Sequence, residues 1–418
     1  MTTERAHQSD NRTRVLRTIW QENEISRAAL SRSLRLAPST VSGIVQELLD
    51  DGLIVVSHVA RSRGGRPPVV LRFAEDGFAF LGVDLGASHV RVGLLDCRGN
   101  LLHSVGMPWP VENDPSGTLD LVDRLVASTL ETREAQARHV VGLGLSVPSP
   151  LDPRTPGLLS PRILPCWEGI PVLSRVRALT GLPTWIDNDA NVGALAELWW
   201  GAGRGVQDIA YIKVATGVGS GLVIGGHVFR GSAGVAGEIG HTAIDPRGPL
   251  CRCGLHGCLE AMIGSASLRR LVEERLADGA SSMLSQVDPG PEQIATAARA
   301  SDAVALDVLS HAGRYLGIAV ANLVNLLNPA RVVVGGSLPV LAGDELLDPM
   351  RATLAQRTLG RSFEATEVVV SALGEDAVVL GAATQVLEAA LENPSLFADR
   401  LGSRPAHNPN VAALRSGA

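Results

Sequence analysis

The sequence predicts an α/β protein in two parts, a small N-terminal domain and a larger domain of two lobes. Three short amphipathic helical segments and two strand-like runs fill residues 1–75, and a strand–turn–strand unit that begins at residue 80 recurs at residue 209. With 418 residues, of which 45% are hydrophobic, the chain can bury the cores of several domains. We therefore assign residues 1–75 to the first domain and residues 76–393 to the second, followed by a flexible tail at 394–418.

The first domain has the helix pattern of a helix-turn-helix. Segment 11–20 carries one apolar face, and a second helix is expected to begin at Ser26, a residue type that caps helix N-termini. A third helix is expected from Pro38, because proline suits the first helical position. Its apolar residues recur at helical spacing and are Val41, Ile44, Val45, Leu48 and Leu49.

Small polar side chains begin the third helix, where a helix-turn-helix presents residues to base edges. The predicted DNA contacts on this helix are Ser39, Thr40, Ser42 and Gln46. The strand-like runs 53–56 and 69–71 flank a glycine-rich tip, the pattern of a wing that contacts phosphate or a minor groove. The arginines predicted to make those contacts are Arg61, Arg63 and Arg66.

The distribution of charge along the chain agrees with a double-stranded DNA partner for the first domain. Residues 1–75 contain 11 Arg against 8 Asp and Glu, whereas the whole chain has a formal net charge of -6. A small helical docking module is the alternative interpretation. It explains the apolar stripe of the third helix, but neither the polar residues at its start nor the arginine-rich hairpin after it.

Three glycine-rich turns follow buried strands in the second domain. Glycine lets backbone N–H groups approach phosphate oxygens closely, and three such turns on a two-lobed pattern predict a phosphate site. The residues concerned are Asp84, Gly86, Ser88, Thr216, Gly217, Gly335 and Gly336. Between the first two turns, the polar run 187–191 opens a helix at 192–200. Helix capping accounts for one of these polar side chains, and the excess predicts the mouth of a cleft between the lobes.

Three of the five cysteines lie within the eight residues 251–258, and a histidine precedes them by ten positions. Thiolate and imidazole are the ligands that tetrahedral zinc takes, so the cluster predicts a zinc site. A group of reduced cysteines in a tight turn is the alternative. The odd number of cysteines, the absence of an apolar run long enough to cross a membrane and the polar first ten residues predict a cytoplasmic protein.

Six motifs together resemble the ROK family (repressors, open reading frames and kinases), in particular its regulators with an N-terminal winged helix. They are Asp84-Leu85-Gly86, Asp187-Asn188-Asp189-Ala190-Asn191, Thr216-Gly217-Val218-Gly219, Gly237-Glu238-Ile239-Gly240-His241, the Cys251–Glu260 signature and Gly335-Gly336-Ser337. The resemblance covers about residues 11–390. It implies an actin-like, hexokinase-type ATPase fold with two ribonuclease H-like lobes, one at 80–187 with a returning helix at 380–391 and the other at 188–379.

The resemblance also implies a role for each motif. In the family's kinases, the aspartate that matches Asp189 takes the proton from the attacking sugar hydroxyl. The residues implied to bind the sugar are Asn188, Asp189, Glu238, His241 and Glu260. The residues implied to hold zinc are His241, Cys251, Cys253 and Cys258. Four protein ligands leave no open position, so the expected Zn²⁺ is structural.

The phosphate turns depart from the kinase pattern. Ala87 replaces a glycine of the first turn, Ala215 replaces the usual glycine before Thr216, and Ser149 follows Pro148 where glycine is usual. Segment 160–167 also departs from the family's Pro-Asn-Leu run, which bears on the choice of sugar. These changes argue against the use of ATP with Mg²⁺, while the sugar residues are retained.

The sequence therefore predicts a sugar-responsive transcriptional regulator, a repressor of carbohydrate-utilisation genes. A sugar or sugar phosphate would change the closure of the lobes, so that two winged helices of a homodimer or homotetramer no longer match their operator half-sites. An active ATP-dependent hexose kinase that carries a DNA-binding domain is the alternative, because Asp84 and Asp189 are both present. A scaffold that binds another protein through its core is a third interpretation.

Overall fold

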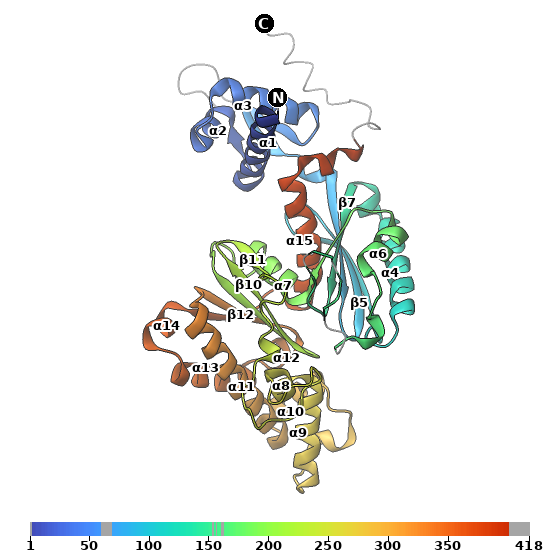
Figure 1. The fold of residues 1–418 in the computed structure, drawn as a ribbon, viewed down its shortest axis with the longest axis vertical. Coiled ribbons are helices and arrows are strands. Elements are labelled where there is room, and N and C mark those ends of the chain that lie inside the picture. The colour runs from blue at the N-terminus through green and yellow to red at the C-terminus, as the bar shows by residue number, and fades with distance from the viewer. Residues whose placement is uncertain (1, 60–68, 153, 156, 160–162, 401–418) are drawn as a thin grey trace.

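The computed structural model describes residues 2–59, 69–152, 154–155, 157–159 and 163–400. Figure 1 shows three bodies in a row, with the N-terminal domain at one end, one lobe in the middle and the other lobe at the far end. The wing-tip residues Arg61, Arg63 and Arg66 lie outside the described residues, as does the segment from 401 onward.

The N-terminal domain is a winged helix-turn-helix. Its elements are α1 (Thr2–Glu22), β1 (Ile25–Ser26), α2 (Arg27–Leu34), α3 (Pro38–Asp50), β2 (Ile54–Val59) and β3 (Val69–Phe73). The helix starts follow the prediction, since the Ser26 hydroxyl accepts a hydrogen bond from the Ala29 N–H at 3.3 Å and Pro38 begins α3. The strands form a sheet in the order β1-β3-β2, and the apolar faces of α1 and α3 are buried against it and each other.

The two lobes contain five-stranded sheets with the same topology. The first sheet has β4 (Phe78–Leu85), β5 (His89–Leu95), β6 (Leu101–Pro108), β7 (His139–Val147) and β8 (Thr184–Asn188), in the order β6-β5-β4-β7-β8. The second has β9 (Ile209–Val214), β10 (Val218–Ile224), β11 (His227–Phe229), β12 (Arg331–Gly335) and β13 (Glu367–Val370), in the order β11-β10-β9-β12-β13. In each sheet the first three strands are antiparallel and the last two add in parallel. The repeated unit in the sequence is therefore a repeated sheet, and the fold is the actin-like, hexokinase type.

Helices cover the outer faces of both sheets. The first lobe carries α4 (Pro115–Leu130), α5 (Arg133–Gln136) and α6 (Val172–Thr180). The second carries α8 (Leu259–Ile263), α9 (Ser265–Ala277), α10 (Pro291–Arg299), α11 (Ala303–Leu327), α12 (Ser337–Ala342), α13 (Asp344–Arg357) and α14 (Gly360–Ala365). Among the described residues, α11 alone is long and apolar enough to cross a membrane, and its apolar stripe is buried in the core of the second lobe. That burial identifies α11 as a core helix.

Two further helices lie between the sheets. Helix α7 (Asp189–Trp199) packs on β9 and β10, and α15 (Ala377–Glu392) packs on β4, β5 and β7 (Figure 1). The two helices also pack on each other, and a Cβ at Gly381 of α15 would lie 1.7 Å from the Val192 carbonyl oxygen of α7. Glycine is therefore required at this position, because a side chain would push the two helices apart.

The chain beyond α15 differs from the expectation. Residues 394–400 form a 3₁₀ helix rather than the beginning of a flexible tail, and Phe397 is fully buried. Its ring packs against those of Phe73, Phe78 and Phe80, with centroids at 5.6, 4.8 and 6.4 Å. Phe73 ends the winged helix and Phe78 begins the first lobe, so this segment packs across the junction between the two domains.

Candidate functional site

The first glycine turn is filled by the protein's own side chains. Asp84 is the last but one residue of β4 and is buried. Its Oδ1 accepts a hydrogen bond from Ser146 Oγ at 2.7 Å, and its Oδ2 lies 3.0 Å from His89 Nε2. Burial acts to raise the pKa of Asp84, but the hydrogen bond with His89 and the positive charge of Lys213 hold it below its ordinary value. The His89 ring lies over Gly86, since a Cβ there would be 2.2 Å from the imidazole Cε1. Ser88 is exposed on the same turn.

Asp189 occupies the first position of α7 and both of its oxygens have partners. Oδ1 accepts from the Ala190 N–H at 2.8 Å, and Oδ2 accepts from the Lys213 ammonium at 2.6 Å. Burial acts to lower the pKa of Lys213, but the charges of Asp189 and Asp84 raise it, so the lysine stays charged. Asn188 caps the same helix through Oδ1, which accepts from the Ala190 N–H at 2.9 Å. The Asn188 side-chain oxygen is thus engaged by the helix, which leaves the Nδ2 amide nitrogen as the possible donor to a ligand.

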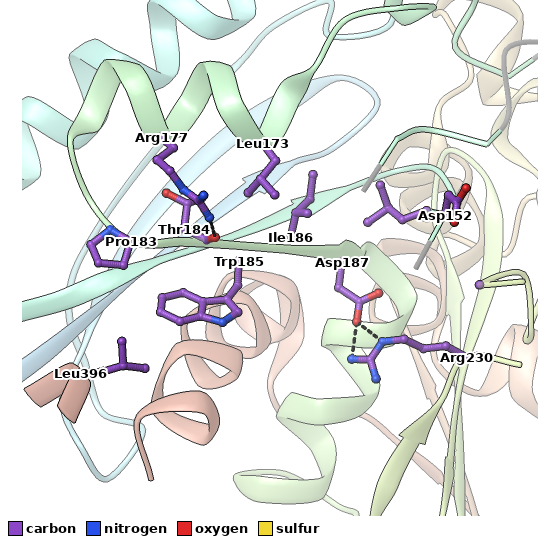
Figure 2. A pocket seen from close by; sticks show the side chains of 12 residues that line it. Asp152, Leu173, Arg177, Pro183, Thr184, Trp185, Ile186, Asp187, Arg230 and Leu396 are labelled. Carbon is purple, nitrogen blue, oxygen red and sulfur yellow. Dashed lines mark hydrogen bonds and ion pairs between the residues drawn. The ribbon is translucent and has the colours of Figure 1, made fainter. Parts of the chain in front are cut away.

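Asp187 has a structural role. Its Oδ1 accepts from Asn191 Nδ2 at 2.9 Å, and its Oδ2 accepts from Arg230 Nε and Nη2 at 2.8 and 2.6 Å. Because Arg230 follows β11 of the second lobe, this ion pair joins the two lobes. Figure 2 shows it at one end of a pocket of about 550 Å³, with Trp185 and Leu396 toward the other end. The pocket is mostly apolar and contains none of the residues predicted to bind sugar.

The second glycine turn is covered by Glu260. Glu260 Oε2 accepts from the Val218 N–H at 3.0 Å and would lie 2.5 Å from a Cβ at Gly217. Glu260 Oε1 accepts from Arg252 Nε at 3.1 Å, and Arg252 Nη1 donates to Glu112 Oε1 at 2.8 Å. Glu112 belongs to the first lobe, so Arg252 connects a predicted sugar residue with the opposite side of the cleft. Thr216 is exposed on this turn.

The third turn lies against the same strand. Gly335 pairs with Lys213 in the parallel ladder of β12 and β9, and Gly336 has a φ of +91° with its Cα hydrogen facing the Val214 backbone. A side chain at Gly336 would be strained as well as crowded. The sheet thus places the third turn beside Lys213.

The predicted metal ligands form one compact cluster. The ligand atoms of His241, Cys251, Cys253 and Cys258 all lie within 4.8 Å of one another. The Cys253 and Cys258 sulfurs are 3.7 Å apart, and Cys251 Sγ is 3.7 Å from His241 Nδ1. A tetrahedron with Zn–S bonds of about 2.3 Å has edges of about 3.8 Å, so the donor set fits zinc in type and in spacing. Burial and the neighbouring thiols raise the pKa of Cys258 to about 12, and a bound divalent cation would reverse this effect.

The metal cluster adjoins the sugar residues through His241. His241 Nδ1 faces the sulfurs, while Nε2 lies 3.9 Å from Glu238 Oε2. Burial and the charges of Asp189 and Glu260 raise the pKa of Glu238 to about 7. His241 thus connects the metal cluster with Glu238, a residue implied to bind the sugar.

The predicted DNA-contacting residues on α3 lie on its outward face. Ser39, Thr40 and Gln46 are exposed and Ser42 is half-buried. Gln46 Nε2 donates to Asp50 Oδ1 at 2.9 Å on the same face. The side chains of this face therefore remain accessible to a groove.

Comparison with known proteins identifies the fold and the family. The ROK family model matches residues 80–389. The chain belongs to the ROK family. The MarR family model matches residues 9–63, so the chain joins a winged helix of that type to a ROK domain, the architecture of a ROK transcriptional regulator.

Three similar proteins represent the two branches of the ROK family. The chain is 32% identical over 389 residues to the xylose repressor of Caldicellulosiruptor bescii, covering 92% of this chain and 97% of that protein. It is 34% identical to the glucokinase of Thermotoga maritima, covering 74% of this chain and 97% of the kinase. A solved ROK family transcriptional regulator, a homologue of the Escherichia coli Mlc protein, superposes with a TM-score of 0.81 at 30% identity, covering 93% and 99% of the two chains. The match to the ROK regulator covers nearly the whole chain, whereas the match to the glucokinase covers about three quarters of it.

Sequence reasoning missed the cations of the ROK cleft. Lys213 pairs with Asp189 and Arg230 pairs with Asp187, and both aspartates belong to a predicted motif. Arg252 pairs with Glu112 and with Glu260, a residue implied to bind the sugar. For Lys213 a signal was present, because it is the one lysine in a chain whose other basic residues are all arginine. No local pattern marks the two arginines.

Proposed function

We propose that the protein is a sugar-responsive DNA-binding repressor of carbohydrate-utilisation genes. The observation that carries this proposal is helix α7, which begins at Asp189 in the cleft and ends against the DNA-binding domain. Its 11 residues extend over about 16 Å. A ligand that shifts Asn188 or Asp189 therefore acts on a rigid element whose other end touches the winged helix.

The contact at the far end of α7 is aromatic and specific. Trp199 and Trp200 pack against Trp20 of α1, with ring centroids 5.2 and 6.3 Å away. The Trp20 indole N–H donates to the Cys97 carbonyl at 3.1 Å, and Arg98 Nη1 donates to the Trp20 carbonyl at 2.8 Å. Trp20 thus contacts both the first lobe and the end of α7, so a movement of α7 relative to the first lobe is expected to reorient the DNA-binding domain.

Closure of the lobes supplies the two states that such a switch needs. Two ion pairs, Arg230–Asp187 and Arg252–Glu112, connect the two lobes at separate places. A sugar held by Asp189, Glu238, His241 and Glu260 of the second lobe would favour one closure through its differential affinity for the two positions of the first lobe. In a homodimer or homotetramer, the changed orientation of the winged helices would alter the fit to two operator half-sites.

Zinc would serve this function as a structural brace. The residues His241, Cys251, Cys253 and Cys258 would hold Zn²⁺, which neutralises the thiolates and fixes the loop that carries His241 and Glu260. With Nδ1 on the metal, His241 Nε2 would be left to a sugar hydroxyl. We also place the protein in the cytoplasm, where its cysteines would remain reduced.

An active sugar kinase is the second candidate function, favoured by the presence of both Asp84 and Asp189. A thermal-shift screen separates the two, with sugars tested alone and together with ATP and Mg²⁺. We expect a sugar at roughly a hundred times its Kd to add about 2.7 kcal/mol of stability, and ATP to add nothing further. Stabilisation by ATP together with transfer of its phosphate to a hexose would instead establish the kinase.

A further inference from the structure

We propose that the cleft selects an uncharged sugar over its phosphate ester, because His89 and the Lys213–Asp189 pair fill the corner that a phosphate group would have to enter. This inference rests on the proposed sugar response and specifies its ligand class. We use the name phosphate corner for the space bounded by Asp84, Gly86, His89, Asp189 and Lys213.

The first turn offers a phosphate no open approach to the backbone. The His89 ring covers Gly86, the glycine at which a phosphate oxygen would come nearest the chain. The Gly86 N–H is already bonded to the His89 carbonyl at 3.0 Å. One residue thus occupies both the surface of the turn and one of its donors, and Asp84 holds the imidazole in that place at 3.0 Å.

Lys213 supplies the phosphate corner with a built-in cation that is already paired. Its ammonium lies 2.6 Å from Asp189 Oδ2, and the two side chains are only 16% and 15% exposed. On β9 the lysine lies beside Gly219 and Gly335 in the adjacent strands, and neither neighbour has a side chain that could compete for the space. The ammonium of Lys213 is therefore already engaged by Asp189, and a phosphate would have to compete with that carboxylate for it.

The charge of the phosphate corner opposes an anion. Asp84 and Asp189 bring two carboxylates against the one ammonium of Lys213, while the Glu260 carboxylate on the neighbouring second turn is paired with Arg252. A phosphate monoester would add a charge of about −1.5 to −2. In a partly buried site such like charges repel much more strongly than in water, so the ester pays a penalty that the free sugar does not.

An uncharged hydroxyl suits the same groups. Each Asp189 oxygen accepts one hydrogen bond in the structure, and a carboxylate oxygen has a second lone pair. A sugar hydroxyl can donate to that lone pair without displacing Lys213. The ion pair thus leaves Asp189 as a positioned acceptor for a neutral polyol.

The test is isothermal titration of the full-length protein with matched pairs of probes in a buffer without phosphate. The pairs are glucose and glucose 6-phosphate, mannose and mannose 6-phosphate, and xylose and xylose 5-phosphate. We expect at least one neutral sugar to bind, and its ester to bind at least about tenfold more weakly. An ester that binds as tightly as its sugar, or more tightly, overturns the inference while leaving the sugar response intact. Failure of every probe to bind contradicts both the inference and the proposed sugar response.

A variant assigns the selectivity to the phosphate corner. His89→Ala removes the ring that covers Gly86. The Kd of the ester divided by the Kd of its sugar should therefore fall at least about threefold toward unity. His103→Ala is the matched control, because it makes the same substitution on the outer strand β6 of the same lobe. An unchanged ratio in His89→Ala would show that the phosphate corner does not set the selectivity, and circular dichroism would verify that both variants fold.

Discussion

Replacing Cys258 by serine should abolish the sugar response and lower thermal stability together. Cys258 is fully buried and lies two residues before Glu260, so the metal site and the sugar site share this segment. Loss of a residue that only supports a metal ligand weakens binding by about 10- to 100-fold, and loss of a direct ligand should weaken zinc binding by more. We expect zinc content by atomic absorption to fall below one ion per chain, with sugar binding undetectable by titration.

Cys166→Ser is the matched control for this prediction. Cys166 is exposed and lies outside the cluster, so this variant should keep its zinc and its melting temperature. DNA binding by Cys258→Ser should persist, because the core around α1 and α3 is continuous with the first lobe and does not include the cysteine cluster, which lies in the second lobe. A Cys258→Ser protein that loses zinc but still binds sugar normally would contradict the proposed role of zinc as a structural brace for the sugar-binding loop.

The second large effect is expected from Asp189→Asn. The substitution removes the acceptor implied to bind the sugar and leaves the Lys213 ammonium without its partner in a partly buried site. Breaking such a pair by removing one member costs about 3 kcal/mol. We expect sugar titration to give no heat, and urea unfolding to give a lower free energy of unfolding.

A double variant separates the two consequences. Asp189→Leu combined with Lys213→Met removes both charges and should recover most of the stability, because replacing a buried pair by apolar groups is often neutral. It should not recover sugar binding, since the acceptor is still missing. If the double variant binds sugar like the parent protein, Asp189 is not a sugar-contacting residue.

Features encoded in neighbouring residues could be predicted from the sequence. The helices of the winged domain were readable because Ser26 and Pro38 are local start signals and the apolar stripe of α3 has helical spacing. The metal cluster was readable because its cysteines lie within one short loop and its histidine lies ten residues upstream. The repeated strand–turn–strand unit, likewise local, pointed to two lobes, and the two sheets do have the same strand order.

Contacts between distant residues could not be predicted. The partners in Lys213–Asp189, Arg230–Asp187 and Arg252–Glu112 are 24, 43 and 140 positions apart. Their pairing depends on how the two sheets pack around α7 and α15, which no local pattern encodes. Phe397 was missed for the same reason, because its pocket is formed by Phe73, Phe78 and Phe80 rather than by its own neighbours.

The central claim is that a sugar bound in the cleft changes operator binding. It is tested most directly by the affinity of the full-length protein for operator DNA, measured by fluorescence anisotropy with and without a sugar that titration shows to bind. The operator would be selected from random duplexes by the protein itself. We expect the sugar to weaken binding by at least about tenfold, a coupling free energy of roughly 1.4 kcal/mol. Trp20→Leu, which removes the aromatic contact with α7, should bind the same DNA but respond less to the sugar. Operator affinity that stays the same when the cleft is saturated with sugar would contradict the account.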